Sequence, residues 1–409
     1  MNRTPQPTDT LYFGDVFRGQ KVLITGNTGF KGSWLTTLLL RLGARVYGLA
    51  DNVPTEPSLF REIGLESQLE AQHWVDIRDL DAVREVVESV QPDFLFHLAA
   101  QAILLDSYRD PVRTFTTNVL GTTHVLEVLR LWGGPCTAVI ITSDKCYENV
   151  EQVWGYRESD RLGGKDVYSG SKGASELIFY SYFHSFFKNS TKQLRLATAR
   201  AGNVIGGGDW AKDRIVVDCM QAWNLNEQVQ IRSPYATRPW QHVLEPLSGY
   251  LRIAQVLQQD PRLNGESFNL GPPGEQDKTV LDLIAALSRY WHFATPGDAY
   301  EYDEQLRPQF DEAKLLRLNC DKAEAYLGWL PTLNFRETVR MVSEWYYAFY
   351  REKSDMLGHT VADIDSYLRH ATAKGHLWTS AEPRSNADDA ETNRLRDELH
   401  TIRKRQGAA

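Results

Sequence analysis

Ala138-Val139-Ile140-Ile141-Thr142-Ser143-Asp144-Lys145, with Tyr168-Ser169-Gly170-Ser171-Lys172 after an irregular connection, is the stretch that decides the fold. Its four apolar residues predict a buried strand that ends at a hydroxyl, an acid and an amine. Tyr168 and Lys172 are four residues apart, so they share one face of the helix predicted to begin there. The lysine ammonium is expected to lower the pKa of the Tyr168 phenol, making a base for an alcohol proton. The same spacing fits a core tyrosine and a solvated lysine.

The composition is that of an ordinary globular protein, since 42% of its 409 residues are hydrophobic and 24% are charged. Its formal net charge of -8 argues against a general nucleic-acid-binding protein. No apolar run is long enough to span a membrane, and Met1–Asp9 lacks the hydrophobic region of a signal peptide. The four cysteines are far apart and form no Cys/His cluster. We therefore expect a cytoplasmic protein with reduced thiols, no metal site and no membrane association.

Near the N-terminus, a strand, a glycine-rich turn, a helix and a second strand follow one another. The strand Lys21–Thr25 leads into the turn Gly26-Asn27-Thr28-Gly29-Phe30-Lys31-Gly32, and the strand 45–50 ends at Asp51. This is a βαβ unit whose glycines let a pyrophosphate approach the N-terminus of the helix. Asp51 is placed to accept hydrogen bonds from ribose hydroxyls and would repel a 2′-phosphate, which favours NAD over NADP. The alternative is an ordinary acid at the start of a loop.

Strands and helices continue to alternate as far as residue 200. The pattern predicts strands at 73–75 and 94–98 and helices at 80–90 and 112–131. Asp76 and Ile77, after the first of these strands, either flank an adenine ring or form a plain strand end. Ala99 and Ala100 follow the second, and their small side chains leave room for a ligand. Each polar motif stands at the carboxyl end of a strand, where doubly wound sheets bind ligands.

Several motifs together resemble known enzymes. The extended short-chain dehydrogenase/reductase superfamily is matched by Thr25-Gly26-x-x-Gly29-Phe30-x-Gly32, His97-Leu98-Ala99-Ala100, Asn118-x-x-Gly121-Thr122 and Tyr168-x-x-x-Lys172. Within it, the CDP-glucose 4,6-dehydratases are resembled by Ser143-Asp144-Lys145-Cys146-Tyr147-Glu148-Asn149, by Trp154-Gly155-Tyr156-Arg157-Glu158, by Gly206-Gly207-Gly208-Asp209-Trp210 and by the stretch 238–250. The likeness covers about residues 14–370.

The resemblance implies a Rossmann-type doubly wound parallel sheet with a smaller, interleaved C-terminal substrate-binding lobe. Residues 14–200 would form the NAD-binding domain, and residues 201–370 mainly the substrate lobe, with segments returning to the first domain. Residues 371–409 are expected to be a polar tail, which is either a solvated helix or disordered. The residues implied to bind NAD are Gly26, Gly29, Phe30, Gly32, Asp51, Asp76, Ile77, Leu98, Ala99, Ala100, Asn118, Tyr168 and Lys172.

The implied reaction converts CDP-glucose to CDP-4-keto-6-deoxyglucose with NAD retained. The C5 proton of a hexose becomes acidic only after C4 is oxidised, so Tyr168 first takes the proton of the C4 hydroxyl while NAD takes the hydride. A simple dehydrogenase needs only a residue such as Ser143 beside the tyrosine, whereas Asp144 and Lys145 suit an additional acid/base pair. By the resemblance, Asp144 protonates the departing C6 hydroxyl and Lys145 removes the C5 proton, before the hydride returns to C6. The alternative is a surface ion pair of Asp144 and Lys145.

The residues indicate the identity of the substrate less specifically than the type of reaction. Asn203, Arg214 and Arg238 are the candidates for binding it, the two arginines through the diphosphate. For each arginine, a surface salt bridge is the alternative. Ala102 and Leu105 stand where family members usually carry a proline and an arginine, so another sugar nucleotide, or an epimerase, remains open. The apolar helices 112–131 and 168–187 predict a homodimer or a higher oligomer.

Overall fold

The computed structural model describes residues 5–231, 233–272, 278–293, 295–302, 315–380, 393–398 and 400–401. Seven parallel strands form one sheet in the order β11-β6-β5-β4-β1-β2-β3. They are β1 (Lys21–Thr25), β2 (Arg45–Ala50), β3 (Ala71–Trp74), β4 (Phe94–His97), β5 (Cys136–Ile141), β6 (Leu194–Ala201) and β11 (Ser267–Leu270). The order reverses between β1 and β4, which confirms the predicted doubly wound sheet.

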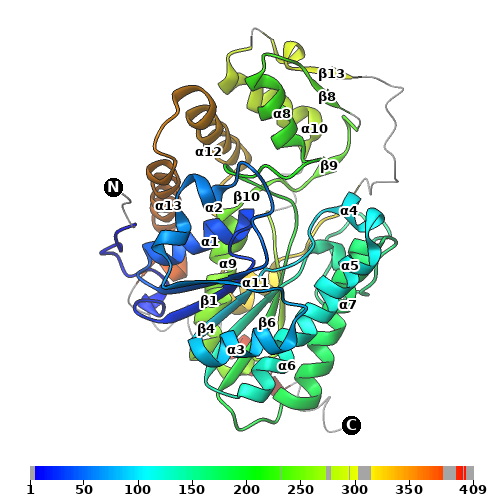
Figure 1. Ribbon diagram of the computed structural model, residues 1–409. Helices are drawn as coiled ribbons and strands as arrows, with labels where there is room; N and C mark the ends of the chain where they lie inside the picture. The colour runs from blue at the N-terminus through cyan, green and yellow to red at the C-terminus, as the bar shows by residue number, and fades with distance from the viewer. Residues whose placement is uncertain are drawn as a thin grey trace.

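Helices cover both faces of this sheet (Figure 1). One face carries α1 (Phe30–Arg41), α9 (Leu244–Gln259) and α13 (Met356–Ala373), and the other carries α3 (Leu80–Val90), α6 (Gly121–Trp132) and α7 (Val167–Tyr182). All six residues of β5 are buried because both of its faces meet helices. Successive residues alternate between two cores, Val139 in one and Ile140 in the other. This explains why the strand reads as an unbroken apolar run.

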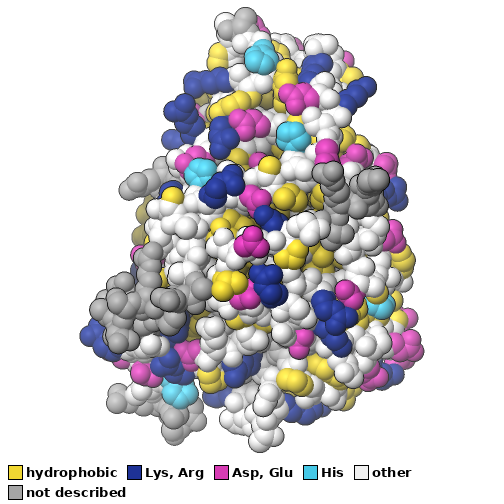
Figure 2. All heavy atoms as spheres, turned by 90° about the vertical axis from the view of Figure 1, so that its left-hand side faces the viewer, with side chains coloured by type: hydrophobic (Ala, Val, Ile, Leu, Met, Phe, Trp, Pro, Cys, Tyr) yellow, Lys and Arg dark blue, Asp and Glu magenta, His cyan; other side chains and the backbone are white. Residues whose placement is uncertain are grey.

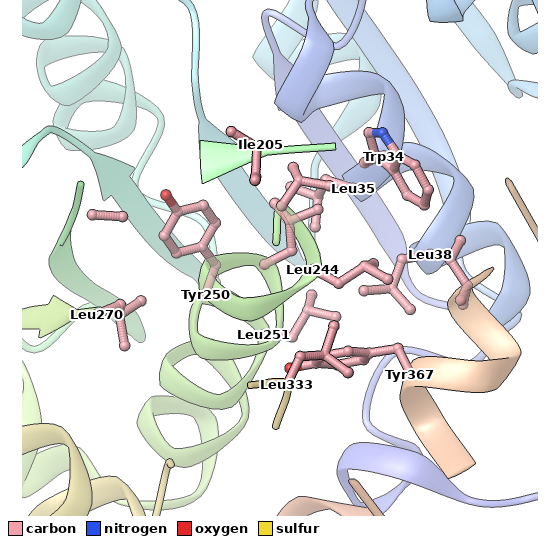
Figure 3. Close-up of a cluster of buried hydrophobic side chains, with 14 of the residues drawn as sticks. Trp34, Leu35, Leu38, Ile205, Leu244, Tyr250, Leu251, Leu270, Leu333 and Tyr367 are labelled. Atoms are coloured by element: carbon pink, nitrogen blue, oxygen red, sulfur yellow. The ribbon is translucent and has the colours of Figure 1, made fainter. Parts of the chain in front are cut away.

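The larger core joins distant parts of the chain. Figure 3 shows Leu35 and Leu38 of α1 beside Leu244 and Leu251 of α9, with Tyr367 of α13 below them. Beyond α13, the buried Trp378 stacks on Phe13 with ring centroids 4.7 Å apart. α13 ends at Ala373, so the domain boundary predicted at residue 371 falls inside this helix, and the described chain continues to residue 380. Of the predicted tail, residues 381–392, 399 and 402–409 lie outside the described residues.

A smaller lobe stands above the carboxyl edge of the sheet in Figure 1. It contains α8 (Ile215–Asn224), α10 (Val280–Ser288), β8 (Val229–Ile231) paired with β13 (Tyr300–Tyr302), and β9 (Thr237–Arg238) paired with β12 (Lys278–Thr279). The chain leaves the lobe for α9 and β11 and then re-enters it, so the predicted interleaving is confirmed. The remaining elements are α2 (Leu59–Glu62), α4 (Leu104–Arg109), α5 (Pro111–Phe115), α11 (Asp321–Leu327), α12 (Phe335–Tyr347), β7 (Val204–Ile205) and β10 (Gln241–His242).

The long helix predicted at 112–131 is built from three parts. It consists of α5, a π-helical turn at Thr116–Leu120 and α6, which follow one another without a break. A similar π-helical turn, Phe183–Phe187, extends α7. Such turns keep the apolar face continuous while shifting its register, which hydrophobic periodicity alone does not reveal.

The structure also shows the distribution of surface charge and the surroundings of the cysteines. On the face seen in Figure 2, acidic and basic side chains are interspersed. None of the helices in the described part of the chain is both long and apolar enough to cross a bilayer. Within the same residues, no three His, Cys, Asp or Glu side chains gather as a metal site would require. Cys136, Cys146, Cys219 and Cys320 are all unpaired.

Candidate active site

The centre of the site is the loop after β5. Ser143 begins a single helical turn, Asp144–Cys146, and its Oγ accepts a hydrogen bond from the Lys145 amide at 3.2 Å. The same hydroxyl donates to Oδ1 of Asp144 at 2.8 Å. A serine at this position caps the turn, so the local sequence itself fixes where the next two side chains begin. Asp144 is buried against Gly202, where an added Cβ would lie 3.0 Å from Oδ2.

Burial determines the protonation of Asp144. It raises the pKa of this carboxyl, although Lys145, the Ser143 hydrogen bond and Lys31 each lower it. A raised pKa keeps the proton on the carboxyl to higher pH, which suits a group that donates a proton. The alternative interpretation, a surface ion pair of Asp144 and Lys145, would need an exposed Asp144, and Asp144 is only 4% exposed.

Tyr168 and Lys172 both lie buried in the first two turns of α7. Burial raises the pKa of Tyr168 to about 12, against the lowering effects of a hydrogen bond with Ser143 and the charge of Arg214. The expectation that a lysine cation lowers this pKa is therefore wrong, because loss of hydration outweighs the Ser143 hydrogen bond and the charge of Arg214. Burial also lowers the pKa of Lys172 to about 8.

Lys31, in the glycine turn, is a charged group of the site that the sequence interpretation did not single out. Its pKa is lowered to about 8 by burial first and then by Arg214 and Lys172, while Asp144 raises it. Its ammonium is thus close enough to the catalytic loop to interact with it. The sequence did contain a signal for Lys31, because it is the one charged residue in the turn 26–32.

The glycine turn fits the phosphates of a dinucleotide. Gly26 has φ +75°, and a Cβ there would lie 2.7 Å from the amide nitrogen of Ala99. A Cβ on Gly32 would lie 2.1 Å from the carbonyl oxygen of Gly26. Gly29 caps α1 without any side-chain hydrogen bond, so the first amides of the helix are available to an anion. Phe30, beside it, packs against the turn at Gly206.

The end of β4 lies directly beside this turn. Leu98 donates its amide to the Thr25 carbonyl at 3.0 Å, and Ala99 donates to the Thr25 hydroxyl at 3.3 Å. Ala100 follows them and is half-buried. The predicted room for a ligand is thus bounded by small residues of two neighbouring strand ends.

Asn118 joins this strand end to α7. Its amide group donates to the Gln101 carbonyl at 3.0 Å and to the Ser171 hydroxyl at 2.8 Å, and its Oδ1 accepts from the Gln101 amide at 2.8 Å. Both amide hydrogens are therefore used within the protein. Direct binding of a cofactor by Asn118 stays a prediction. Its hydrogen bonds do show that it connects Gln101, after β4, with Ser171 on α7.

The predicted adenine side contains Asp51, Asp76 and Ile77. Asp51 is exposed after β2, and its charge acts on Arg78. Arg78 donates to Asp76 at 2.5 Å and lowers the pKa of that carboxyl. The Ile77 side chain is buried beneath Gly121, where a Cβ would lie 2.4 Å from Cδ1. Of the two acids, Asp76 is paired with Arg78, whereas no ion pair between described residues involves Asp51.

The substrate candidates lie at different distances from the catalytic loop. Asn203 follows Gly202, which touches Asp144. Arg214 forms an ion pair with Asp209 at 2.6 Å, but the Asp209 side chain is buried, so this is not the surface salt bridge of the alternative interpretation. The charge of Arg214 also lowers the pKa of Tyr168. Arg238 stands farther out in the lobe, on β9, and donates to the Thr237 carbonyl at 2.8 Å.

A second ion pair lies beneath the loop and was also missed. Arg200 of β6 and Glu176 of α7 meet at 2.8 Å and are almost fully buried. Glu176 stands four residues after Lys172, a spacing that could have been noticed. Its partner on another strand could not be found from sequence spacing.

The comparisons with known proteins agree with this geometry. The model of the family described as GDP-mannose 4,6 dehydratase matches residues 23–342. A protein of Salmonella typhimurium named CDP-glucose 4,6-dehydratase is 43% identical, over 87% of this chain and 98% of its own length.

Solved structures show the same fold. UDP-glucose 4-epimerase of Thermotoga maritima has a TM-score of 0.69 at 21% identity, over 80% of this chain and 99% of its own. The dTDP-glucose 4,6-dehydratase of Bacillus anthracis, in complex with NAD, has a TM-score of 0.67 at 17% identity, over 83% and 100%. Since the family model spans most of the chain and the Salmonella protein aligns over nearly its whole length, this chain belongs to the GDP-mannose 4,6 dehydratase family.

Proposed function

We propose that this protein is an NAD-retaining 4,6-dehydratase that converts CDP-glucose to CDP-4-keto-6-deoxyglucose. The observation that carries the proposal is a buried carboxyl with a raised pKa, Asp144, hydrogen-bonded to Ser143 and next to Lys145 and Tyr168. An alcohol oxidation alone needs no such carboxyl, whereas water loss needs a proton donor. The Salmonella typhimurium relative supports CDP-glucose as the substrate.

The cofactor is assigned to the glycine turn and the carboxyl ends of β1, β2 and β4. Gly26, Gly29 and Gly32 would admit its phosphates, and Asp51 its adenosine ribose. When bound, NAD supplies the acceptor for the C4 hydrogen and later returns that hydrogen to C6. Tyr168 and Lys172 would stand next to the reacting end.

Each catalytic side chain then has one task. Tyr168 takes the C4 hydroxyl proton, and it ionises more readily once a further positive charge, such as that of an oxidised nicotinamide, is present. Lys145 removes the C5 proton that the C4 ketone has made acidic, which is the role that the resemblance implies for it. Asp144 gives its proton to the leaving C6 hydroxyl, and Ser143 keeps the carboxyl oriented.

The substrate residues are Asn203 and Arg214, with Arg238 contributing from the lobe. Arg214 holds Asp209 with one side of its guanidinium and has further donors for a diphosphate. Leu105, on α4, stands where relatives usually carry an arginine, so the choice of nucleotide is the part most in need of an assay.

The first test is of the reaction itself. Incubation with NAD and CDP-glucose should give the alkaline absorbance of a 4-keto-6-deoxy sugar. UDP-glucose, dTDP-glucose and GDP-mannose, tested in parallel, should give less product. A C4 or C2 epimer without loss of water would show an epimerase instead and overturn the proposal.

The second prediction separates the two halves of the reaction. Tyr168→Phe should abolish the absorbance of reduced nicotinamide, because no base remains for the C4 hydroxyl. Asp144→Asn and Lys145→Ala should still form it but lose about 10²–10⁴-fold in product formation. Deuterium exchange at C5 should vanish in Lys145→Ala and persist in part in Asp144→Asn.

Lys165→Ala is the matched control for these variants, since this lysine is exposed in the connection before α7. It should turn over like the wild type. Wild-type rates in both Asp144→Asn and Lys145→Ala would remove the chemical basis of the dehydratase assignment.

The third prediction concerns the cofactor. Fluorescence titration should show tighter binding of NAD than of NADP, because the Asp51 carboxylate repels a 2′-phosphate. Asp51→Ala should narrow that preference, whereas Glu88→Ala, at an exposed acid of α3, should leave it unchanged. Equal affinities in the wild type would refute the role of Asp51.

The fourth prediction concerns assembly. Val112, Leu131, Leu177 and Tyr180 expose 48–70% of their surface on α5, α6 and α7, and we take the outer side of these helices as the candidate apolar face. We therefore propose a homodimer or higher oligomer built on this face. Light scattering of the wild type should give at least a dimer, and Leu177→Asp with Tyr180→Asp should reduce it to a monomer.

The control for assembly is Leu225→Asp, which changes an equally exposed leucine at the end of α8 in the lobe. It should not alter the mass. A monomeric wild type at micromolar concentration would contradict the assignment of this face.

A further inference from the structure

The buried ion pair beneath the catalytic loop has no step in the proposed reaction. Arg200 Nη2 lies 2.8 Å from Glu176 Oε2, and the two side chains are 3% and 1% exposed. Removing both charges from water costs about as much as their attraction returns, so such a pair is weak evidence for stability. The Arg200 Nε is also buried without a hydrogen-bond partner. The other contacts of Glu176 and Arg200 therefore say more about the role of these residues than their ion pair does.

Glu176 holds the entry of the catalytic loop. Its Oε1 accepts a short hydrogen bond from the hydroxyl of Thr142, the residue directly before Ser143. Its Oε2 accepts from Thr198 on β6 at 2.9 Å. The carboxylate thus ties the carboxyl ends of β5 and β6 to α7, at the point where the chain leaves the sheet for the catalytic residues.

Arg200 holds the exit of the same loop. Its Nη1 donates to the Tyr147 hydroxyl at 2.7 Å, and its guanidinium lies over the Tyr147 ring at 5.0 Å. Tyr147 follows directly after the Asp144–Cys146 turn. The Tyr147 hydroxyl in turn donates to Asn269 on β11 at 2.7 Å. Both ends of the six-residue segment Thr142–Tyr147 are therefore held by one ion pair.

We propose that Glu176 and Arg200 are positioning residues, which fix both ends of the Ser143–Cys146 loop and place a negative charge one helical turn from Lys172. The inference rests on the proposed function, because it takes the loop to be catalytic. Acid/base groups lose about 10²-fold in rate when they are displaced by about 1 Å, so a loop that carries two of them needs both ends held.

The charges around Lys172 make the second half of this role testable. The groups that face it are Glu176 on its own helix, the Cys146 thiol, His97 at the end of β4 and Lys31 on α1. Burial raises the pKa of Cys146 well above its usual value and lowers that of His97 to about 3, so both are neutral near pH 7. Arg200 and hydrogen bonds lower the pKa of Glu176, which stays ionised. Glu176 is therefore the negative charge among these groups.

The charge of Glu176 determines in which direction the pKa of Lys172 changes when Glu176 is replaced. Burial lowers the pKa of Lys172 to about 8, and the charge of Glu176 works against that lowering. In Glu176→Gln the opposing charge is lost, so Lys172 loses its proton at a lower pH. The alkaline limb of kcat/KM should then move to lower pH, whereas Glu176→Asp, which keeps the charge, should leave the limb near its wild-type position.

The experiment compares Glu176→Gln, Glu176→Asp, Tyr147→Phe and the exposed control Glu85→Gln in the full chain with NAD. For Glu176→Gln we expect kcat about 10²-fold lower with KM for CDP-glucose little changed, besides the shifted alkaline limb. Tyr147→Phe loses the hydroxyl that Arg200 holds but keeps its charges, so kcat should fall without any shift of the limb. Glu85→Gln should change neither quantity. Thermal unfolding reports whether each variant is folded.

A second readout does not depend on turnover. The pH dependence of acetylation of Lys172 by acetic anhydride, followed by peptide mass spectrometry, should shift to lower pH in Glu176→Gln but not in Glu176→Asp. An unchanged labelling profile, or a loss of kcat that is uniform with pH and matched by a loss of folded protein, would overturn the inference. An inactive wild type with the expected labelling shift would instead count against the proposed function alone.

Discussion

Burial of charged side chains at the carboxyl edge of one parallel sheet is the constraint on which the site depends. Asp144, Lys172, Glu176 and Arg200 are each less than 9% exposed, so none keeps its full hydration. A group in that position either finds a partner or shifts toward its neutral form. Glu176 is paired with Arg200, and the pKa of its carboxyl is lowered. Among the described residues Asp144 forms no buried ion pair of that kind, and its pKa is raised. Two buried carboxyls of one site, Glu176 on α7 and Asp144 after β5, are thereby shifted in opposite directions, the first toward its charged form and the second toward its neutral form.

The sequence was informative where the signal is local. The strands at 21–25 and 45–50 and the helix at 80–90 have the predicted bounds, because apolar runs, a glycine turn and an Asp79 cap mark them within a few residues. The motifs also brought the Ser143 loop and Tyr168 to one place, since carboxyl ends of parallel strands share an edge. The roles given to these residues remain predictions.

What the sequence could not supply depends on contacts between distant segments. The direction of the Tyr168 pKa shift was wrong because desolvation depends on what packs over α7, not on the spacing to Lys172. The stacking of Trp378 on Phe13 joins residues far apart in the chain, and no local sequence pattern indicates it. The Asn118 motif was recognised, but its hydrogen bonds to Gln101 and Ser171 require the fold.

The remaining electrostatics connect the cofactor turn with the catalytic loop. Lys31 and Lys172 each have a pKa lowered to about 8, chiefly by burial, and the positive charges of Arg214 and Lys172 add to the lowering at Lys31. Cations gathered in this way are stabilised by any anion bound among them. A diphosphate entering the site would therefore raise the pKa of both lysines and favour their charged forms. Ligand binding and the protonation of the catalytic groups are in this way linked, since each changes the free energy of the other.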